Sequence, residues 1–455
     1  MIAFSFRTFL YTFVSAALLI SCGGDGKRGN RGREEAEPPA ASSESAPAAG
    51  APAAGATLAA APKSLRAKLY LEASGSMFPY DAPGSKGEFN ASLQQLLTAF
   101  EAEKSGSTEL FAVNDNVYPL GVSFQELVEK PDVFSLARGK GDSKNTDFSL
   151  IFKTILSELK EGDVGVLFSD LIYSTPSTSA QSSTKILADV ETLMQTTFAP
   201  QAKGKSLLLL QLSGEFKGTY YPHHGGGKAY SGSRPYYIAL LATNATMKAL
   251  LSDDTFEPLR RFADLPGFES FHYFTSAADN TPFYTVLLKD ADQAGRFDQS
   301  HEERKNDKAA VHTLESIEAD RKTRGLTVVL GVDLGGFYLP EAYKANPKSY
   351  VLESDEGFKI QKIIAEKGPE GYTHKFLLNT AEPQGGGKRE ITLRLKRRFP
   401  PDWIARTTTD DDTDTRSGDF AGSTFGLLNF TRGIEKAYNP QKADTYFAVT
   451  VFLQD

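Results

Sequence analysis

Residues 67–77 read AKLYLEASGSM, a short apolar run that ends in a turn of small polar residues. The run has the length of a β-strand, and the turn follows it directly. Similar apolar runs recur along the chain at residues 108–113, 117–122, 164–168, 206–212 and 236–242. Amphipathic segments alternate with these runs at residues 90–104, 148–159, 183–198 and 245–251. This alternation predicts an α/β fold with a doubly wound, mostly parallel sheet that helices cover on both faces.

The pattern changes from about residue 256 to strands separated by turn signals. These candidate strands lie at residues 271–275, 283–288, 326–330, 373–378, 390–395 and 446–452. We also expect a charged helix near residues 309–322 and another helix at residues 427–437. The sequence therefore predicts a Rossmann-like α/β domain at residues 65–253, followed by a β-rich, sandwich-like domain at residues 254–455.

The composition excludes several classes of protein. The chain has 455 residues, of which 40% are hydrophobic, and its net charge is −7, so it is long enough to bury more than one core. It has no long stripe of Lys and Arg, which argues against a nucleic-acid partner. Its one cysteine excludes an intramolecular disulfide and a cysteine-rich zinc module.

The N-terminal residues 1–21 have the pattern of a bacterial lipoprotein signal peptide. Arg7 precedes an apolar stretch that is too short to span a membrane, and the stretch ends in LISCG at residues 19–23. This ending resembles a lipobox, which implies that Cys22 carries acyl chains such as palmitate. The alternative is an ordinary secretory peptide with a cysteine near its cleavage region. Residues 22–64 are rich in Pro, Ala, Ser and Gly and are expected to form a flexible, lipidated linker.

Polar side chains follow the predicted strands at the ends where an open parallel sheet binds ligands. Glu72, Ser74 and Ser76 follow the first strand, Thr146 precedes the helix at residues 148–159, and Asp170 follows the strand at residues 164–168. Hydroxyl and carboxylate oxygens suit a hard cation such as Mg²⁺, Ca²⁺ or Mn²⁺.

Residues 65–252 resemble a von Willebrand factor A domain, whose metal-ion-dependent adhesion site uses Asp-x-Ser-x-Ser, a Thr and an Asp on three loops. The resemblance implies that Ser74 and Ser76 ligate a divalent cation directly. It implies that Glu72, Thr146 and Asp170 do so directly or through water, and that an open position accepts an acidic side chain of a partner. Glu72 stands where the family has Asp, so its extra methylene requires a backbone adjustment, the loss of a water or a larger ion such as Ca²⁺.

Two other segments carry potential metal ligands. His223 and His224 lie in a glycine-rich insert, where adjacent imidazoles rarely meet at one ion and no third ligand is near in the sequence. We interpret this insert as a solvated loop. Asp410, Asp412 and Asp414 resemble the start of a calcium loop, but the Gly and Glu that such a loop needs are missing. We interpret this segment as an exposed acidic loop.

The sequence contains no positive sign of an enzyme. It has no Gly-x-Ser-x-Gly motif, and a hydrolase would need a histidine such as His272 or His312. The leading hypothesis is a non-enzymatic, adhesion-type binding lipoprotein of the bacterial cell envelope. A lipid would attach it to the periplasmic or surface face of a membrane, and its variant adhesion site would bind a protein partner with the help of a metal. The alternative is a metal-free structural or scaffolding lipoprotein of an envelope assembly.

Overall fold

The computed structural model describes residues 62–454, except for residues 103–107, 174–180, 277–280, 307–308, 382 and 384–385. Cys22, the predicted signal peptide and all but the last three residues of the predicted linker lie outside the described residues. No helix within the described part of the chain is long and apolar enough to cross a membrane.

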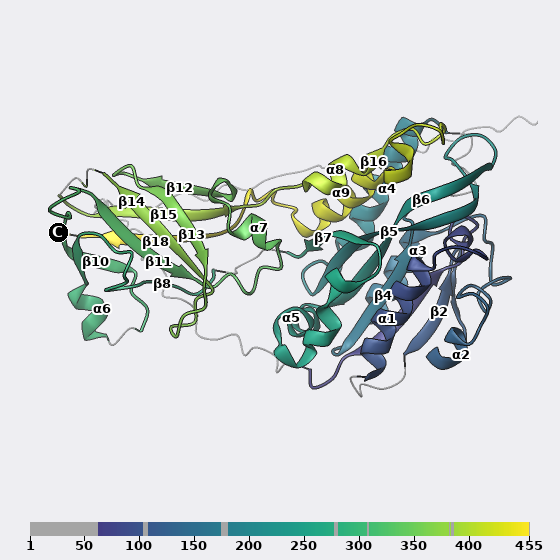
Figure 1. The fold of residues 1–455 in the computed structure, drawn as a ribbon, viewed down its shortest axis with the longest axis horizontal. Helices are drawn as coiled ribbons and strands as arrows, with labels where there is room; N and C mark the ends of the chain where they lie inside the picture. Colours follow the sequence, from purple (N-terminus) through teal and green to yellow (C-terminus); the bar gives the residue numbers. More distant parts are fainter. Residues whose placement is uncertain are drawn as a thin grey trace, which may run out of the picture. The chain divides into compact units, whose positions relative to one another are not determined.

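A seven-stranded mixed sheet carries the candidate site (Figure 1). In the order of the sheet, its strands are β3 (Val117–Pro119), β2 (Glu109–Val113), β1 (Arg66–Glu72), β4 (Asp163–Ser169), β6 (Lys228–Thr243), β5 (Lys205–Tyr220) and β7 (Phe268–Phe274). Strand β1 is parallel to both of its neighbours, β2 and β4. The other four pairings are antiparallel.

The expectation of a mostly parallel sheet is therefore wrong. Strands β5 and β6 form a long hairpin that pairs from Lys205↔Thr243 to Tyr220↔Lys228. Parallel neighbours need a long crossover connection, whereas residues 221–227 are a short loop and force the two strands to run antiparallel. Strand β6, not β5, lies next to β4, so the hairpin also makes that pairing antiparallel.

Helices cover both faces of this sheet, as the sequence predicted. Helices α1 (Glu88–Ala102) and α5 (Asn244–Ser252) share a core with Leu69 and Leu71 of β1. Tyr70, on the opposite face of the same strand, belongs to the core formed with helices α3 (Phe148–Glu158) and α4 (Ser183–Phe198). Successive residues of a strand point to opposite faces, so the apolar run of β1 supplies both cores. The fold of this part is α/β.

Helix α3 begins next to the candidate site. Phe148, Ile151, Phe152 and Ile155 form its buried stripe, which packs on the sheet. The carboxylate of the N-cap residue Asp147 accepts a hydrogen bond of 3.0 Å from the backbone N–H of Leu150. This cap satisfies one of the N–H groups that a helix start leaves free. It thereby fixes the backbone immediately after residue 146.

The seven-stranded sheet and its core extend past the expected domain boundary at residue 253. Strand β7 pairs with β5, although it lies after that boundary. Helix α9 (Leu427–Tyr438) and helix α8 (Asp402–Arg406) bury Trp403 and Phe430 in the same core as α3 and α4. The C-terminal half of the chain therefore completes the core of the N-terminal half.

Two further sheets face each other across one hydrophobic core. The five-stranded sheet has the order β12 (Tyr350–Ser354), β15 (Arg389–Lys396), β18 (Thr445–Leu453), β10 (Thr313–Glu318) and β9 (Arg296–Gln299). The four-stranded sheet has the order β13 (Lys359–Ala365), β14 (His374–Thr380), β11 (Leu326–Val332) and β8 (Tyr284–Val286). Leu330 and Phe376 of one sheet share a core with Leu393 and Val451 of the other. The β-rich content predicted for this part is confirmed.

The expected helix at residues 309–322 is wrong. Residues Thr313–Glu318 form strand β10, which pairs with β18 and β9. Leu314 and Ile317 have a helical spacing, but Leu314 is buried between the sheets, and Ser316 has a positive φ of 55° where the strand pairing shifts. An irregular strand thus imitates the three-residue period of a helix.

Short elements complete the described chain. They are α2 (Phe124–Val128), α6 (His301–Lys305), α7 (Glu341–Lys344), β16 (Thr408–Thr409), β17 (Thr424–Phe425) and the 3₁₀ helices Phe78–Asp81, Asp254–Arg260, Phe262–Asp264, Pro347–Ser349 and Phe420–Gly422.

His272 and His312, the two histidines considered for a hydrolase, lie in packing environments. The ring of His272 contacts the rings of Phe274 and Phe399 at centroid distances of 4.5 and 5.7 Å. The Nε2 of His312 is 2.9 Å from the carbonyl oxygen of Tyr284, and its ring stacks on the ring of that tyrosine. Burial and, to a smaller extent, the charge of Arg397 lower the pKa of His272 to about 3.

We predict that His272→Gln reduces the loss of stability in acid. His272 stays neutral in the folded chain, whereas the unfolded chain takes up its proton below a pKa of about 6.5. Stability from this group is therefore present above pH 6.5 and is lost as the pH falls toward 3. Between pH 6.5 and 4.5 the variant should lose about 2 kcal/mol less of its free energy of unfolding than the wild type. His301→Gln, which changes an exposed histidine, is the control, and equal losses in both variants would contradict the prediction.

Candidate functional site

The candidate site lies where the parallel strands β1 and β4 end side by side. Leu71 of β1 pairs with Phe168 of β4, so Glu72 and Ser169 end these strands at the same edge of the sheet. Thr146 reaches this edge from the loop before α3. The carboxyl ends of parallel strands are the usual ligand-binding edge of such a sheet.

Glu72 lies at the centre of the site and is 1% exposed. The hydroxyl of Thr146 donates a hydrogen bond of 2.7 Å to its Oε1, and the hydroxyl of Ser169 donates one to its Oε2. Both carboxylate oxygens are thus directed at hydroxyl groups. The sequence reasoning did not select Ser169, although its position directly before Asp170 in the same strand end is a signal that it could have used.

Asp170 and the Ser74–Ser76 turn complete the cluster. Asp170 is 2% exposed, and its Oδ1 accepts a hydrogen bond of 3.0 Å from the backbone N–H of Ile172. Ser76 is close enough to the Asp170 carboxylate to lower its pKa, and the Ser74 and Ser76 hydroxyl oxygens are 3.0 Å apart. Leu171, directly after Asp170, has a positive φ of 55°, which a non-glycine residue adopts at a cost and which often marks a functional turn.

The structure thus brings the five predicted residues together. Thr146 donates a hydrogen bond to Glu72, and the Ser74 hydroxyl lowers the pKa of Glu72. The Ser76 hydroxyl lowers the pKa of Asp170, and the charge of Asp170 raises the pKa of Glu72. These residues come from three segments of the chain. We refer to Glu72, Ser74, Ser76, Thr146 and Asp170 as the strand-end cluster.

Electrostatics make two negative charges in this cluster unfavourable. Burial and, to a smaller extent, the nearby charge of Asp170 raise the pKa of Glu72 to about 8, against the lowering effect of the surrounding hydroxyl groups. Burial also raises the pKa of Asp170. A cation placed among these oxygens would compensate both carboxylates.

Arg234 provides one positive charge near the cluster. It is 1% exposed, and its guanidinium lies over the rings of Phe420 and Tyr220 at 4.1 and 4.7 Å. It donates a hydrogen bond to the Phe420 carbonyl oxygen, and its charge lowers the pKa of Asp170. No local pattern pointed to Arg234, because its surroundings combine the β5–β6 hairpin with a segment almost two hundred residues away.

The β5–β6 hairpin and the loop before α3 flank the Ser74–Ser76 turn. The N–H of Gly75 donates a hydrogen bond of 2.8 Å to the carbonyl oxygen of Ser143. A Cβ atom at Gly75 would lie 3.4 Å from the ring of Tyr221, which is 52% exposed. Tyr221 is therefore an exposed aromatic side chain at the rim of the strand-end cluster.

The chemistry of the strand-end cluster fits a hard divalent cation. All its side-chain donors are oxygens, which Mg²⁺, Ca²⁺ and Mn²⁺ prefer. The hydroxyl of Thr146 donates its hydrogen bond to Glu72, so the lone pairs of the hydroxyl oxygen stay available for an ion. Ser74, Ser76, Thr146 and Asp170 would hold the ion, and Glu72 would orient the hydroxyl groups around it.

Comparison with known proteins adds no family to this description. No protein-family model, curated protein or solved structure matches the chain. The resemblance to a von Willebrand factor A domain therefore rests on the three motifs alone.

The two other segments with potential metal ligands differ from their expected structures. His223 stacks on Phe425 at a centroid distance of 4.3 Å instead of lying in a solvated loop. Asp412 is 1% exposed, so the segment around it is not simply an exposed acidic loop. His223 and Asp412 contact each other although 189 positions separate them in the sequence.

Proposed function

We propose that the chain is a lipid-anchored binding protein of the bacterial cell envelope, and that its strand-end cluster recognises a protein partner with the help of a divalent cation. The observation that carries this proposal is the convergence of five oxygen-bearing side chains from three segments at one edge of the sheet. The lipobox-like sequence before Cys22 supports the anchor. The proposed role is binding, not catalysis.

The residues of the cluster are oriented before any ligand arrives. Glu72 accepts hydrogen bonds from the hydroxyl groups of Thr146 and Ser169, and the Ile172 N–H donates one to the Asp170 carboxylate. Pre-organised ligands lose little conformational freedom when an ion binds, which strengthens binding. A bound divalent ion would supply positive charge and an open position for an acidic side chain of the partner.

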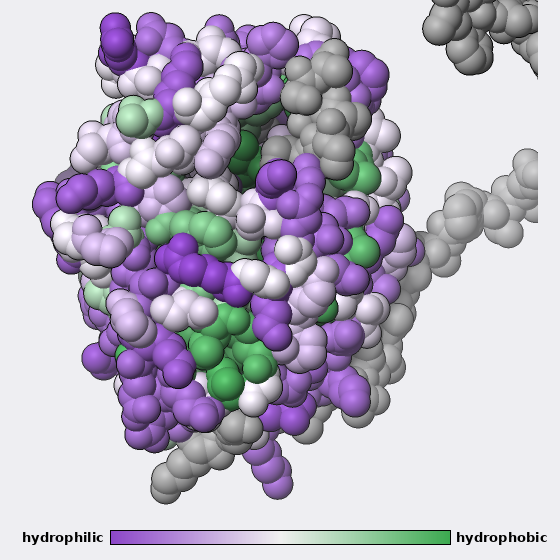
Figure 2. Space-filling view, turned by 90° about the vertical axis from the view of Figure 1, so that its right-hand side faces the viewer, coloured by the Kyte–Doolittle hydropathy of each residue, from purple (hydrophilic) through white to green (hydrophobic). Residues whose placement is uncertain are grey.

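The described surface exposes few large apolar side chains. The side of the molecule seen in Figure 2 is mostly hydrophilic, and its apolar side chains gather in small areas. Among the described residues, the exposed large apolar side chains are Tyr221, Phe283 and Leu288. An interface that combines one aromatic side chain with a charged centre agrees with this surface, because a few anchors carry most of the binding energy in many interfaces.

Arg234 favours a second candidate function. Its buried positive charge already compensates part of the charge of Asp170. The same domain would then act without a metal, as a structural or scaffolding lipoprotein whose strand-end cluster is held by hydroxyl hydrogen bonds and by Arg234.

A photo-crosslinking amino acid in place of Tyr221 should form adducts with the partner in intact cells of the native host. Asp170→Asn should reduce the adducts at least about tenfold, because it removes a charged ligand of the ion. Cys22→Ser should release the protein from the membrane fraction. The crosslinker in place of Phe283, which is exposed but belongs to the β-rich part, is the control.

The effect of a chelator on the adducts separates the metal-dependent function from the scaffolding function. Adducts that disappear with a membrane-permeable chelator support the metal-dependent function, whereas adducts that persist support the scaffolding function. Equal adducts at positions 221 and 283, or adducts that do not change in Asp170→Asn, would contradict recognition at the strand-end cluster.

A further inference from the structure

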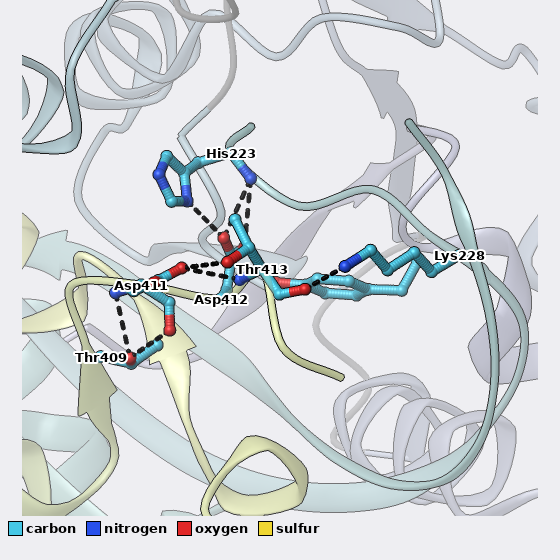
Figure 3. A network of polar contacts seen from close by, with 7 residues as sticks. His223, Lys228, Thr409, Asp411, Asp412 and Thr413 are labelled. Atoms are coloured by element: carbon cyan, nitrogen blue, oxygen red, sulfur yellow. Dashed lines mark hydrogen bonds and ion pairs between the residues drawn. The ribbon is translucent and has the colours of Figure 1, made fainter. Parts of the chain in front are cut away.

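A histidine and two aspartates that do not belong to the strand-end cluster meet at the turn of the β5–β6 hairpin. His223 lies in the loop that joins β5 to β6, and Asp411 and Asp412 lie in the segment between β16 and the 3₁₀ helix Phe420–Gly422. One ligand atom from each of the three residues lies within 4.8 Å of the others. Figure 3 shows the ring nitrogen of His223 directed at the carboxylate of Asp412. Neither segment alone provides these three metal-ligand atoms, and the fold brings the two segments together.

Surrounding groups hold His223 and Asp412 in fixed orientations. The hydroxyl of Tyr220 donates a hydrogen bond to Asp412 Oδ2, and the backbone N–H of His223 donates one of 3.0 Å to Oδ1. The imidazole of His223 stacks flat on the ring of Phe425, with an angle of 2° between the planes. Metal ligands in proteins are commonly oriented by such outer hydrogen bonds and packing.

Asp411 is oriented in the same manner, although it is exposed. Its Oδ1 accepts hydrogen bonds of 2.9 Å from the Thr413 N–H and 2.6 Å from the Thr413 hydroxyl. Both contacts are on Oδ1, and no described residue donates a hydrogen bond to its other carboxylate oxygen.

Among the described residues, no lysine or arginine lies at ion-pair distance from either carboxylate. Within the described chain, Asp412 forms an ion pair with His223, and neither aspartate forms one with a lysine or arginine. The nearest ammonium in Figure 3 is that of Lys228, which donates to the carbonyl oxygen of Thr413 instead. A buried carboxylate next to a second carboxylate is an environment that a bound cation stabilises.

We propose that His223, Asp411 and Asp412 form a site for one divalent transition-metal ion such as Zn²⁺. One imidazole nitrogen and carboxylate oxygens suit metals of this class, whereas the all-oxygen strand-end cluster suits harder ions. His223 Nδ1 and Asp412 Oδ1 are hydrogen-bonded at 2.5 Å. On binding, the N–H bond of Nδ1 breaks, its proton leaves to solvent, and its electron pair binds the metal together with one oxygen of each aspartate. Water fills the remaining positions.

A metal at this site would link the hairpin turn to residues 408–425. His223 follows Tyr221 by two positions, and Tyr221 lies at the rim of the strand-end cluster. The ion would therefore fix the part of the hairpin that flanks the cluster. This inference does not depend on whether the strand-end cluster binds its own ion.

Titration calorimetry with Zn²⁺ on the full chain in detergent tests the proposal. We expect one Zn²⁺ per chain, bound at least about 10-fold more weakly by His223→Gln and by Asp411→Asn. His224→Gln and Asp410→Asn change exposed neighbours of the same residue types, and they should bind within about twofold of the wild type. Asp411 is exposed, so its variant should melt at the wild-type temperature when no metal is present.

Two results would overturn the proposal. Absence of Zn²⁺ binding by the wild type would mean that His223 and Asp412 form only an ion pair. Zn²⁺ binding that survives both His223→Gln and Asp411→Asn would place the ion elsewhere. If Asp170→Asn then abolished that binding, the ion would be at the strand-end cluster, so the proposed function would stand while this inference failed.

Discussion

Thr146→Val and Asp170→Asn should each weaken the binding of Mn²⁺ at least about tenfold. Valine has the shape of threonine but no hydroxyl, so it removes both a ligand oxygen and the hydrogen bond to Glu72 Oε1. Asparagine keeps the size of aspartate and removes the negative charge that the ion would compensate. Calorimetry or the loss of the free Mn²⁺ resonance signal would measure the affinity.

Thr192→Val is the matched control for the first variant. Thr192 is exposed on helix α4, where its hydroxyl donates to the carbonyl oxygen of Ala188. The control should bind Mn²⁺ within about twofold of the wild type. If the wild type binds neither Mn²⁺, Mg²⁺ nor Ca²⁺, the metal-dependent function is wrong, and the scaffolding function, with Arg234 as the compensating charge, becomes the better account.

Gly433→Ala should lower the free energy of unfolding by about 2 kcal/mol. Gly433 lies where helix α9 packs on helix α4. A Cβ atom there would lie 2.2 Å from the carbonyl oxygen of Glu191 and 2.8 Å from the Cβ of Met194. Because the first atom belongs to the helix backbone, α9 itself must move. This steric cost exceeds the gain of about 1 kcal/mol that alanine brings to a helix interior.

The chain offers its own probe and control for this measurement. Trp403 is the single tryptophan, and it is buried in the same core as α9, so its fluorescence reports unfolding of that core in urea. Gly418→Ala is the control, because a Cβ atom at Gly418 meets nothing within 4 Å and its φ is not positive. Equal stability of the two variants would show that α9 and α4 do not pack this closely.

Local patterns in the sequence predicted most of the elements. The apolar runs at residues 67–73 and 164–168 match β1 and β4, and the apolar stripe from Phe148 matches α3. The order of strands in the sheet was not predictable in this way, because the position of β6 beside β4 depends on contacts between distant segments. The helix expected at residues 309–322 failed for a related reason, since pairing with β18 and β9 outweighs a weak local period.

In the candidate site, too, local patterns predicted some residues, whereas contacts between distant segments determine the roles of others. Glu72 and Asp170 could be selected because Glu72 ends a recognisable strand and Asp170 follows another, and the register of β1 and β4 then brings them together. Arg234 and Asp412 could not be selected. Their roles come from the contact of the β5–β6 hairpin with residues 411–420, which no local pattern encodes.

The return of the C-terminal half into the first core has a consequence for the order of synthesis. Helix α9 (Leu427–Tyr438) lies more than 350 positions after β1 in the sequence, yet it supplies Phe430 and Ile434 to the core that β1 begins. A chain that is synthesised from its N-terminus therefore cannot close this core until Tyr438 has been made. The proposed export would require the chain to stay unfolded while it is threaded through a membrane channel, and a core that closes only after helix α9 has been made would meet that need without a separate inhibitor of folding.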